Sequence, residues 1–132
     1  MRVDHFAFEV SNLDRSVAFY RDVIGLPLIM QQVDEEHGEA FAFLKMDGEA
    51  TLELLQQLGA DGATRLGRRL RDSNSPHIAF RVDDLSATLS RLAAAGVRPF
   101  DGPLHLEDVA DWAYLEDPDG NAIEFIQWLD GR

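Results

Sequence analysis

The chain has no cysteine among its 132 residues, which excludes a disulfide framework and a thiol nucleophile. Basic residues are scarce: 12 Lys and Arg stand against 24 Asp and Glu, a formal charge of −12 at pH 7. This charge repels phosphate backbones, and no stripe of basic residues offsets it. The composition therefore argues against a nucleic-acid partner.

Long apolar runs are also missing. No stretch approaches the length that spans a bilayer, and residues 1–4 lack the apolar core of a signal peptide. We therefore expect a cytoplasmic protein without a membrane partner. Hydrophobic residues make up 45% of the chain, which is ordinary for a soluble protein, and 132 residues suffice for one domain with a real core.

A short pattern occurs twice. The segment His5-Phe6-Ala7-Phe8-Glu9-Val10 returns as His77-Ile78-Ala79-Phe80-Arg81-Val82, at an offset of 72 (77 − 5). The segment Leu52-Glu53-Leu54-Leu55-Gln56 returns as Ile123-Glu124-Phe125-Ile126-Gln127, at an offset of 71 (124 − 53). Each copy thus carries one histidine and one glutamate at matching places.

The repeat predicts one domain, residues 1–132, built from two fused modules. Module 1 covers about 1–57 and module 2 about 76–132, with a linker near 58–75. Hydrophobic spacing and turn residues predict β-α-β-β-β in each module, an α+β fold. The expected strands lie near 3–10, 27–33, 39–46 and 50–57, then 77–82, 97–101, 111–116 and 121–128. The expected helices begin after Ser11-Asn12 and Asp83-Asp84 and end at Gly25 and Gly96.

Side chains alternate between the two faces of a strand, which divides the residues of the repeat into two sets. One set is apolar and is expected to pack under the helices: Phe6, Phe8, Leu52, Leu54, Ile78, Phe80, Ile123 and Phe125. The other set contains His5, Glu53, His77 and Glu124, which would point into a concave, mixed sheet. Two imidazoles and two carboxylates that converge in one cleft are typical of a metal site.

A simpler reading is that these polar residues only lie on an exposed face of the sheet. A lone histidine on a strand is more often structural than a ligand. However, an unpaired carboxylate buried at a strand centre costs several kcal/mol unless a partner satisfies it. Two such glutamates, both at a strand centre and both matched by a histidine on the opposing strand, favour the metal site.

These segments together resemble the vicinal oxygen chelate superfamily, which includes glyoxalase I, methylmalonyl-CoA epimerase, extradiol dioxygenases and the fosfomycin- and bleomycin-resistance proteins. The resemblance covers nearly the whole chain. It rests on residues 4–8, 18–26, 52–54 and 77–85, and on Glu116-Asp117-Pro118-Asp119-Gly120-Asn121-Ala122-Ile123-Glu124-Phe125.

The resemblance implies a metal-dependent lyase or isomerase. His5, Glu53, His77 and Glu124 match the four ligand positions of the glyoxalase I and epimerase branches. One divalent ion per site (Ni, Co, Zn, Mn or Fe) would bind neighbouring oxygens of a small-molecule substrate. Glu53 or Glu124 would then transfer a proton beside a metal-bound carbonyl or enediolate. A homodimer is implied, with each site inside one chain or shared between subunits.

The branch stays open. Residues 117–120 resemble glyoxalase I, whereas residues 54–59 resemble the epimerase. Glu9 stands where bacterial glyoxalase I presents an arginine to the glutathione carboxylates, which argues against glutathione as co-substrate. A drug-binding protein like the bleomycin-resistance proteins is a further alternative. An extradiol-type dioxygenase is disfavoured, because Glu53 occupies a coordination place that such iron enzymes keep open.

Several other residues are candidates for substrate binding. Glu9 and Arg81 occupy equivalent places of the repeat and would line the cleft mouth, although an exposed ion pair is the alternative. An apolar cleft wall would be formed by Phe41, Phe100, Trp112 and Tyr114. Aromatic residues in strands more often belong to the core, which is the competing interpretation.

Overall fold

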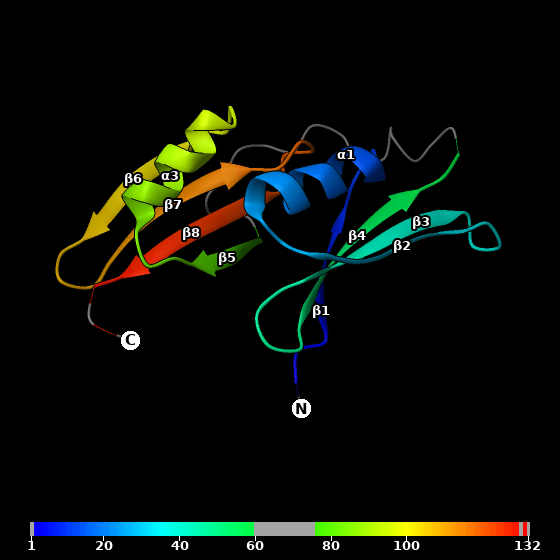
Figure 1. Ribbon diagram of the computed structural model, residues 1–132, viewed down its shortest axis with the longest axis horizontal. Coiled ribbons are helices and arrows are strands. Elements are labelled where there is room, and N and C mark those ends of the chain that lie inside the picture. The colour runs from blue at the N-terminus through cyan, green and yellow to red at the C-terminus, as the bar shows by residue number, and fades with distance from the viewer. Residues whose placement is uncertain (1, 60–75, 130, 132) are drawn as a thin grey trace. The chain divides into compact units, whose positions relative to one another are not determined.

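The computed structural model describes residues 2–59, 76–129 and 131 (Figure 1). The chain divides into two compact units, Met1–Arg69 and Leu70–Arg132, and each contains a four-stranded sheet. The expected linker lies outside the described residues from residue 60 to residue 75. In the part of the chain that is described, no helix is long and apolar enough to cross a membrane.

The first unit forms a mixed sheet with helices on one face. Its elements are β1 (His5–Glu9), α1 (Leu13–Ala18), the π-helix η1 (Phe19–Ile24), β2 (Leu28–Asp34), β3 (Glu39–Lys45) and β4 (Thr51–Gln57). The strand order is β1-β4-β3-β2, with β1 parallel to β4 and the other pairs antiparallel. Helix α1 packs against β3 and β4.

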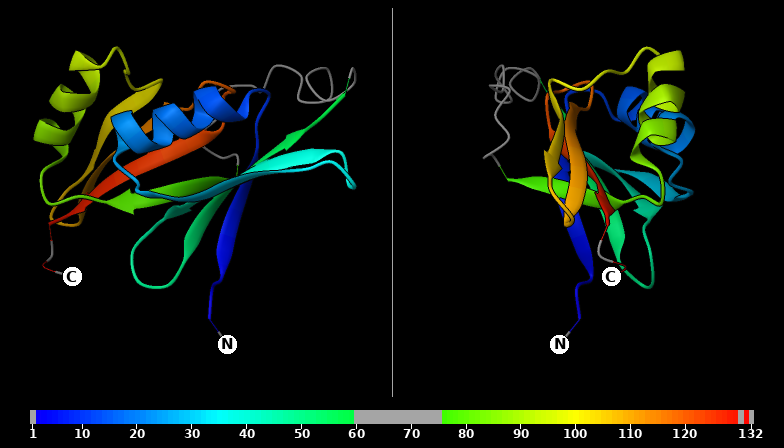
Figure 2. Two further views of the ribbon diagram at one scale, coloured as in Figure 1. Left: turned by 45° about the vertical axis from the view of Figure 1, so that its right-hand side comes forward. Right: turned by 90° about the vertical axis from the view of Figure 1, so that its left-hand side faces the viewer.

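The second unit has the same connectivity. Its elements are β5 (His77–Arg81), α3 (Leu85–Ala94), β6 (Asp101–Leu106), β7 (Ala110–Glu116) and β8 (Ala122–Trp128). The strand order is β5-β8-β7-β6, again with one parallel pair, β5 and β8. Helix α3 covers one face of this sheet (Figure 2). The predicted tandem βαβββ modules are confirmed.

Equivalent polar contacts fix the start of each helix. The Asn12 side chain accepts a hydrogen bond from Arg15 N at 2.9 Å, and the Asp84 side chain accepts one from Ala87 N at 2.8 Å. A second acceptor comes from the last strand of each unit: Oε1 of Gln56 binds Leu13 N at 2.7 Å, and Oε1 of Gln127 binds Leu85 N at 2.8 Å. These bonds tie each helix start to its sheet.

The expected apolar faces pack as alternation predicts. Leu52, Leu54 and Ile123 have no exposed surface, and Phe8 and Phe125 are buried. Phe6 and Phe80, by contrast, are only half-buried. The rest of the core includes Val10, Leu13, Val17, Tyr20, Leu44, Leu85, Leu92 and Leu115. Burial of these side chains on the helix side leaves the opposite sheet face to the polar set.

The prediction for the second strand of module 2 is wrong in its position. A strand was expected near 97–101, but β6 runs from Asp101 to Leu106. Pro103 locally disfavours a strand over residues 101–106, because proline donates no hydrogen bond to a neighbouring strand. The structure accommodates it on an edge strand, where the pairing with β7 shifts register between Asp101 and Leu104. Gly102 has φ +99° and lies against Trp112 O, so a side chain would clash there.

The first helix differs from the prediction in geometry but not in length. It ends at Gly25, which adopts the left-handed conformation as expected. Its second half is a π-helix rather than an α-helix. Hydrophobic spacing does not separate these two helix types over so short a segment, so the wider turn could not be predicted from the residue pattern.

Candidate metal and proton-transfer site

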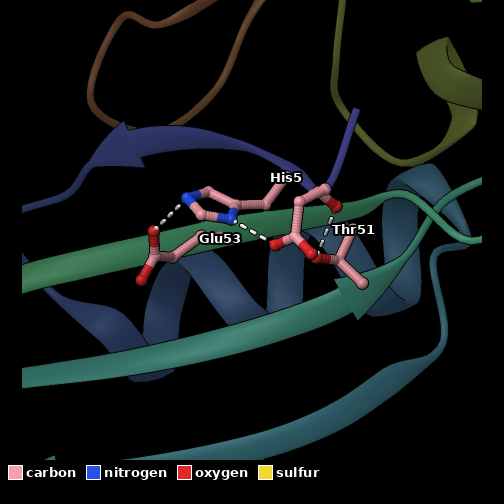
Figure 3. A network of polar contacts seen from close by, with 4 residues as sticks. His5, Thr51 and Glu53 are labelled. Carbon is pink, nitrogen blue, oxygen red and sulfur yellow. Dashed lines mark hydrogen bonds and ion pairs between the residues drawn. The ribbon is translucent and has the colours of Figure 1, made fainter. Parts of the chain in front are cut away.

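The first unit brings His5 and Glu53 together on adjacent parallel strands. Ala7 of β1 is the register partner of Glu53, so His5 lies diagonally across from the carboxylate. Nε2 of His5 is 3.5 Å from Oε2 of Glu53 (Figure 3). The Glu53 side chain is 19% exposed and lies between fully buried Leu52 and Leu54. Alternation therefore places this pair on the face opposite the helix.

The other nitrogen of the His5 ring is held by the preceding residue. Nδ1 lies 2.7 Å from Oδ1 of Asp4. This hydrogen bond, together with the charges of Glu53 and Asp4, raises the pKa of His5 above its usual value despite the opposing effect of burial. Histidines that bind metals commonly donate their second ring N–H to a carboxylate, which orients the free nitrogen. Asp4 therefore aims Nε2 of His5 at Glu53 (Figure 3).

The second unit repeats the pair with a closer contact. Ala79 of β5 is the register partner of Glu124, and Nε2 of His77 is 2.9 Å from Oε2 of Glu124. The side chains are 26% and 12% exposed, so this pair is more shielded from solvent than the first. Each half-buried carboxylate therefore has an imidazole partner inside its own unit.

An aromatic ring stands beside each histidine. Phe43 is the register partner of Glu53. Its ring packs edge to face against the His5 ring, with the two ring centroids 6.0 Å apart. Tyr114 is the register partner of Glu124. Its ring packs edge to face against the His77 ring, with the two ring centroids 5.3 Å apart. Burial, and then the charge of Glu124, raise the pKa of Tyr114. Each pair is thus covered on one side by a ring at an equivalent position.

Each pair supplies two donors of the kind that bind transition metals. Among the described residues, no group of three or more His, Cys, Asp or Glu side chains is assembled as a metal site.

The family model of the Glyoxalase/Bleomycin resistance protein/Dioxygenase superfamily matches residues 2–125. The chain belongs to this superfamily. The predicted resemblance to the vicinal oxygen chelate proteins is confirmed.

Relatives in the superfamily include two kinds of enzyme. Lactoylglutathione lyase of Haemophilus influenzae is 36% identical over 132 residues, with 96% of this chain and 93% of that protein covered. Mitochondrial methylmalonyl-CoA epimerase of Mus musculus is 31% identical over 98 residues, which are 74% of this chain and 54% of that protein.

Solved structures of the superfamily share this architecture. Trypanothione-dependent glyoxalase I of Leishmania major is 26% identical, with a TM-score of 0.75 and with 96% of this chain and 86% of that chain covered. The antibiotic-binding protein TnmS3 of Streptomyces sp. CB03234 is 27% identical, with a TM-score of 0.72 and coverage of 97% and 96%. The fold therefore occurs both in an enzyme and in an antibiotic-binding protein.

The structure distributes the other candidate residues between the units. Glu9 ends β1 and is half-buried, and Arg81 ends β5 and is exposed. Phe41 stands two residues before Phe43, on the same face of β3 as the ring beside His5. Phe100 and Trp112 belong to the second unit and are half-buried. The four predicted aromatic residues of the cleft wall, Phe41, Phe100, Trp112 and Tyr114, are all half-buried.

Sequence reasoning missed Asp4 and Phe43. Phe43 stands 71 residues before Tyr114 (114 − 43), the same offset that relates Glu53 to Glu124. That offset would have selected it as the equivalent of the predicted Tyr114. Asp4 gave no such signal, because the equivalent position is Pro76.

Proposed function

We propose that this protein is a metal-dependent lyase of the glyoxalase I type. The observation that carries the proposal is the equivalent pairing of His5 with Glu53 and of His77 with Glu124. The sequence supports the same choice, because relatives named lactoylglutathione lyase are 36% and 34% identical over nearly the whole chain. The matching epimerase is covered over only 54% of its length.

The four donors suit one divalent ion. Two imidazole nitrogens and two carboxylates fit Ni, Co, Zn, Mn or Fe and leave coordination places for substrate oxygens. His5, Glu53, His77 and Glu124 would hold the ion, with the two pairs supplied by one chain or by two. When bound, the ion supplies Lewis-acid polarisation of two neighbouring substrate oxygens.

The glutamates would carry the proton. In the proposed reaction one carboxylate takes the proton from a C–H next to a carbonyl and returns it to the neighbouring carbon. The adduct of methylglyoxal with a thiol has the required adjacent oxygens, and its isomerisation yields a lactoyl thioester. With exposed fractions of 19% and 12%, the Glu53 and Glu124 side chains are partly shielded from water.

The residues around the metal donors would determine which thiol the enzyme accepts as co-substrate. Glu9 and Arg81 end the strands that carry His5 and His77, and we propose that they contact the thiol portion. A carboxylate at Glu9 repels the carboxylates of glutathione, so a less acidic thiol is favoured. Phe41, Phe100, Trp112 and Tyr114 are proposed to contact the apolar part of the substrate.

A metal-replete activity screen tests the proposal. Protein loaded in turn with Ni, Co, Zn, Mn or Fe is mixed with methylglyoxal and glutathione, a neutral thiol or a cationic thiol, and thioester formation is followed by absorbance. We expect turnover that a chelator removes and that added metal restores. Thioester formation at equal rates in chelated and metal-loaded protein would contradict a metal-dependent lyase.

Ligand binding without chemistry is the second candidate, because an antibiotic-binding protein shares the fold at 27% identity. This function predicts tight binding of an aromatic or cationic drug that does not respond to chelators. A thermal-shift panel separates the two functions, since a ligand or ion that binds only the folded state raises Tm. A shift produced by metal favours the lyase, whereas a shift produced only by drugs favours the binding protein.

A further inference from the structure

The second unit contains a groove between α3 and the edge strand β6 (Figure 1). Its volume is about 700 Å³, which lies within the range of small-molecule sites. Three of its lining residues stand in one row across the sheet, because Gln127 is the register partner of Asp111 and Asp111 is that of His105. Oε1 of Gln127 also binds Leu85 N, at the start of α3. The groove therefore lies on the helix face of the sheet, opposite to the face that carries Glu124.

The first unit has a bridge between helix and edge strand at the equivalent place. There Nε2 of Gln31, on β2, donates a hydrogen bond to Oδ1 of Asp14, in α1, at 2.6 Å. The positions 72 residues later are Ser86 (86 − 14) and Pro103 (103 − 31), and both line the groove. Proline has no side-chain donor and the serine side chain is short, so these two residues cannot form the same bridge. The difference between the modules thus leaves the space between α3 and β6 open.

The groove carries one charge that no neighbour compensates. Its ionisable lining residues are Arg98, His105 and Asp111. Nδ1 of His105 contacts Oδ1 of Asp111, so these two side chains satisfy each other. Arg98 is exposed and makes no hydrogen bond or ion pair with any residue that the structure describes. Its guanidinium is therefore available to an anionic ligand.

Arg98 and the His105–Asp111 pair mark opposite ends of the groove. The row through Asp111 meets the start of α3, whereas Arg98 stands in the loop that follows the end of the helix. A helix of 10 residues rises about 15 Å along its axis. Apolar side chains such as Leu89 and Pro103 line the groove as well. A ligand thus meets a cation at one end, apolar surface along its length and a carboxylate at the other end.

We propose that this groove binds a small molecule with an apolar chain and one terminal carboxylate, which pairs with Arg98. Arginine holds a carboxylate through two parallel N–H···O bonds. A carboxylate at the other end would meet the like charge of Asp111, and this repulsion sets the direction of the ligand. The site lies apart from the His and Glu donors and goes beyond the proposed function, so its test does not require turnover.

Octanoate is the probe, followed by proton–nitrogen NMR and calorimetry on the full chain as purified. We expect saturable shifts of the backbone amide signals of α3 and β6. Octanol and octylammonium keep the chain but remove or reverse the charge, and both are expected to bind about tenfold more weakly or worse. Acetate keeps the carboxylate without the chain and is expected not to saturate. Equal binding of octanoate and octylammonium would overturn the assignment of an anionic ligand.

Two variants test the residues of the groove against a matched control. Arg98→Gln removes the cation and is expected to weaken octanoate binding about tenfold. Ser90→Phe places a ring at an exposed lining position of α3 and is expected to block the chain. Arg91→Gln is the control, because it removes an exposed arginine of the same helix that does not line the groove. Equal octanoate affinity in the parent, Arg98→Gln and Ser90→Phe would overturn the site.

Two further results would assign a different occupant. Octanoate shifts centred on His77 and Glu124, and insensitive to Arg98→Gln, would place the probe at the metal donors and overturn the proposal. Groove signals that change with protein concentration in the absence of octanoate would make a second copy of the chain the occupant, with the same consequence. A protein that turns over none of the thiol adducts would remove the proposed lyase function and leave the octanoate result unaffected.

Discussion

Nε2 of His77 lies 2.9 Å from Oε2 of Glu124, whereas the equivalent atoms of His5 and Glu53 are 3.5 Å apart. Both contacts arise from the same register, in which an alanine of the first strand stands opposite the glutamate. The two His–Glu pairs thus occupy equivalent places in their units, and they differ in the distance between the ring nitrogen and the carboxylate oxygen.

Loss of one imidazole donor should weaken metal binding strongly. Replacing His77 with Ala is expected to lower the affinity for Ni, Co or Zn by about 100-fold or more, since even groups that only orient a ligand contribute 10–100-fold. Metal content after gel filtration and calorimetric titration measure the change. His105→Ala is the matched control, because this exposed histidine pairs with Asp111 outside the proposed donor set. An equal loss in both variants would argue against His77 as a ligand.

Mixing two inactive variants can locate the pairs of one site. If sites are shared between subunits of a homodimer, His5→Ala and His77→Ala chains unfolded and refolded together should regain about a quarter of the parental activity, since half the dimers are mixed and each has one intact site. If both pairs of a site come from one chain, the mixture should stay inactive. Refolding each variant alone is the control, and sedimentation analysis reports whether dimers form.

The contact between Gln127 and the start of α3 should stabilise the second unit. Gln127→Ala leaves Leu85 N, at a part-buried position, without its side-chain acceptor. We expect the free energy of unfolding to fall by about 1–2 kcal/mol, as for loss of a helix N-cap. Gln56→Ala should have a similar effect through Leu13 N. Urea unfolding measures both, and exposed Gln32→Ala is expected to change the free energy by less than about 0.5 kcal/mol.

Gly102 is expected to tolerate no side chain. An added Cβ would lie 3.0 Å from Trp112 O and 3.1 Å from Ala113 Cα, with φ at +99°. Gly102→Ala should therefore reduce the free energy of unfolding by more than about 2 kcal/mol. Gly38→Ala is the control, because φ is also positive there (+68°) but nothing lies within 4 Å of the added atom. That variant should lose about 1 kcal/mol. Equal thermal shifts for the two variants would rule out the clash as the main cause.

The turn between β2 and β3 should depend on pH through Asp34 and His37. Their hydrogen bond raises the pKa of His37 above 6.5 and lowers the pKa of Asp34 below 3.8. The contribution of His37 is fully present below pH 6.5 and is lost as the pH rises through its folded pKa. The contribution of Asp34 is present above pH 3.8 and is lost as the pH falls through its folded pKa. The turn is therefore most ordered between these values.

An NMR titration of the His37 ring measures this effect. Asp34→Asn should return the pKa of His37 toward 6.5, because it removes both the hydrogen bond and the charge. Glu35→Gln removes a nearby exposed carboxylate that makes no contact with the ring and should cause a smaller shift. A His37 pKa that does not respond to Asp34→Asn would contradict the pairing.

Strands with strong alternation were predictable, and β6 was not. The positions of β1, β4, β5 and β8 follow from alternating apolar residues, and their helices begin at capping residues that the sequence displays. Residues 101–106 contain Gly102 and Pro103, which locally disfavour a strand. Pairing with β7 and the register shift overcome that preference. Such pairing is formed by residues distant in the chain, so local propensity could not reveal it.

The sequence by itself singled out the two histidines and the two glutamates of the repeat and indicated the face of the strand on which each lies, because the period of a strand fixes the direction of each side chain. It also determined the superfamily, through a repeat that spans the chain. The tertiary structure decided how the pairs differ: Asp4 orients His5, and the contact between Nε2 and the carboxylate is 2.9 Å in the His77–Glu124 pair but 3.5 Å in the His5–Glu53 pair. Hydrogen bonds of this kind depend on distances of a few tenths of an ångström between separate strands, and residue order does not encode those distances directly.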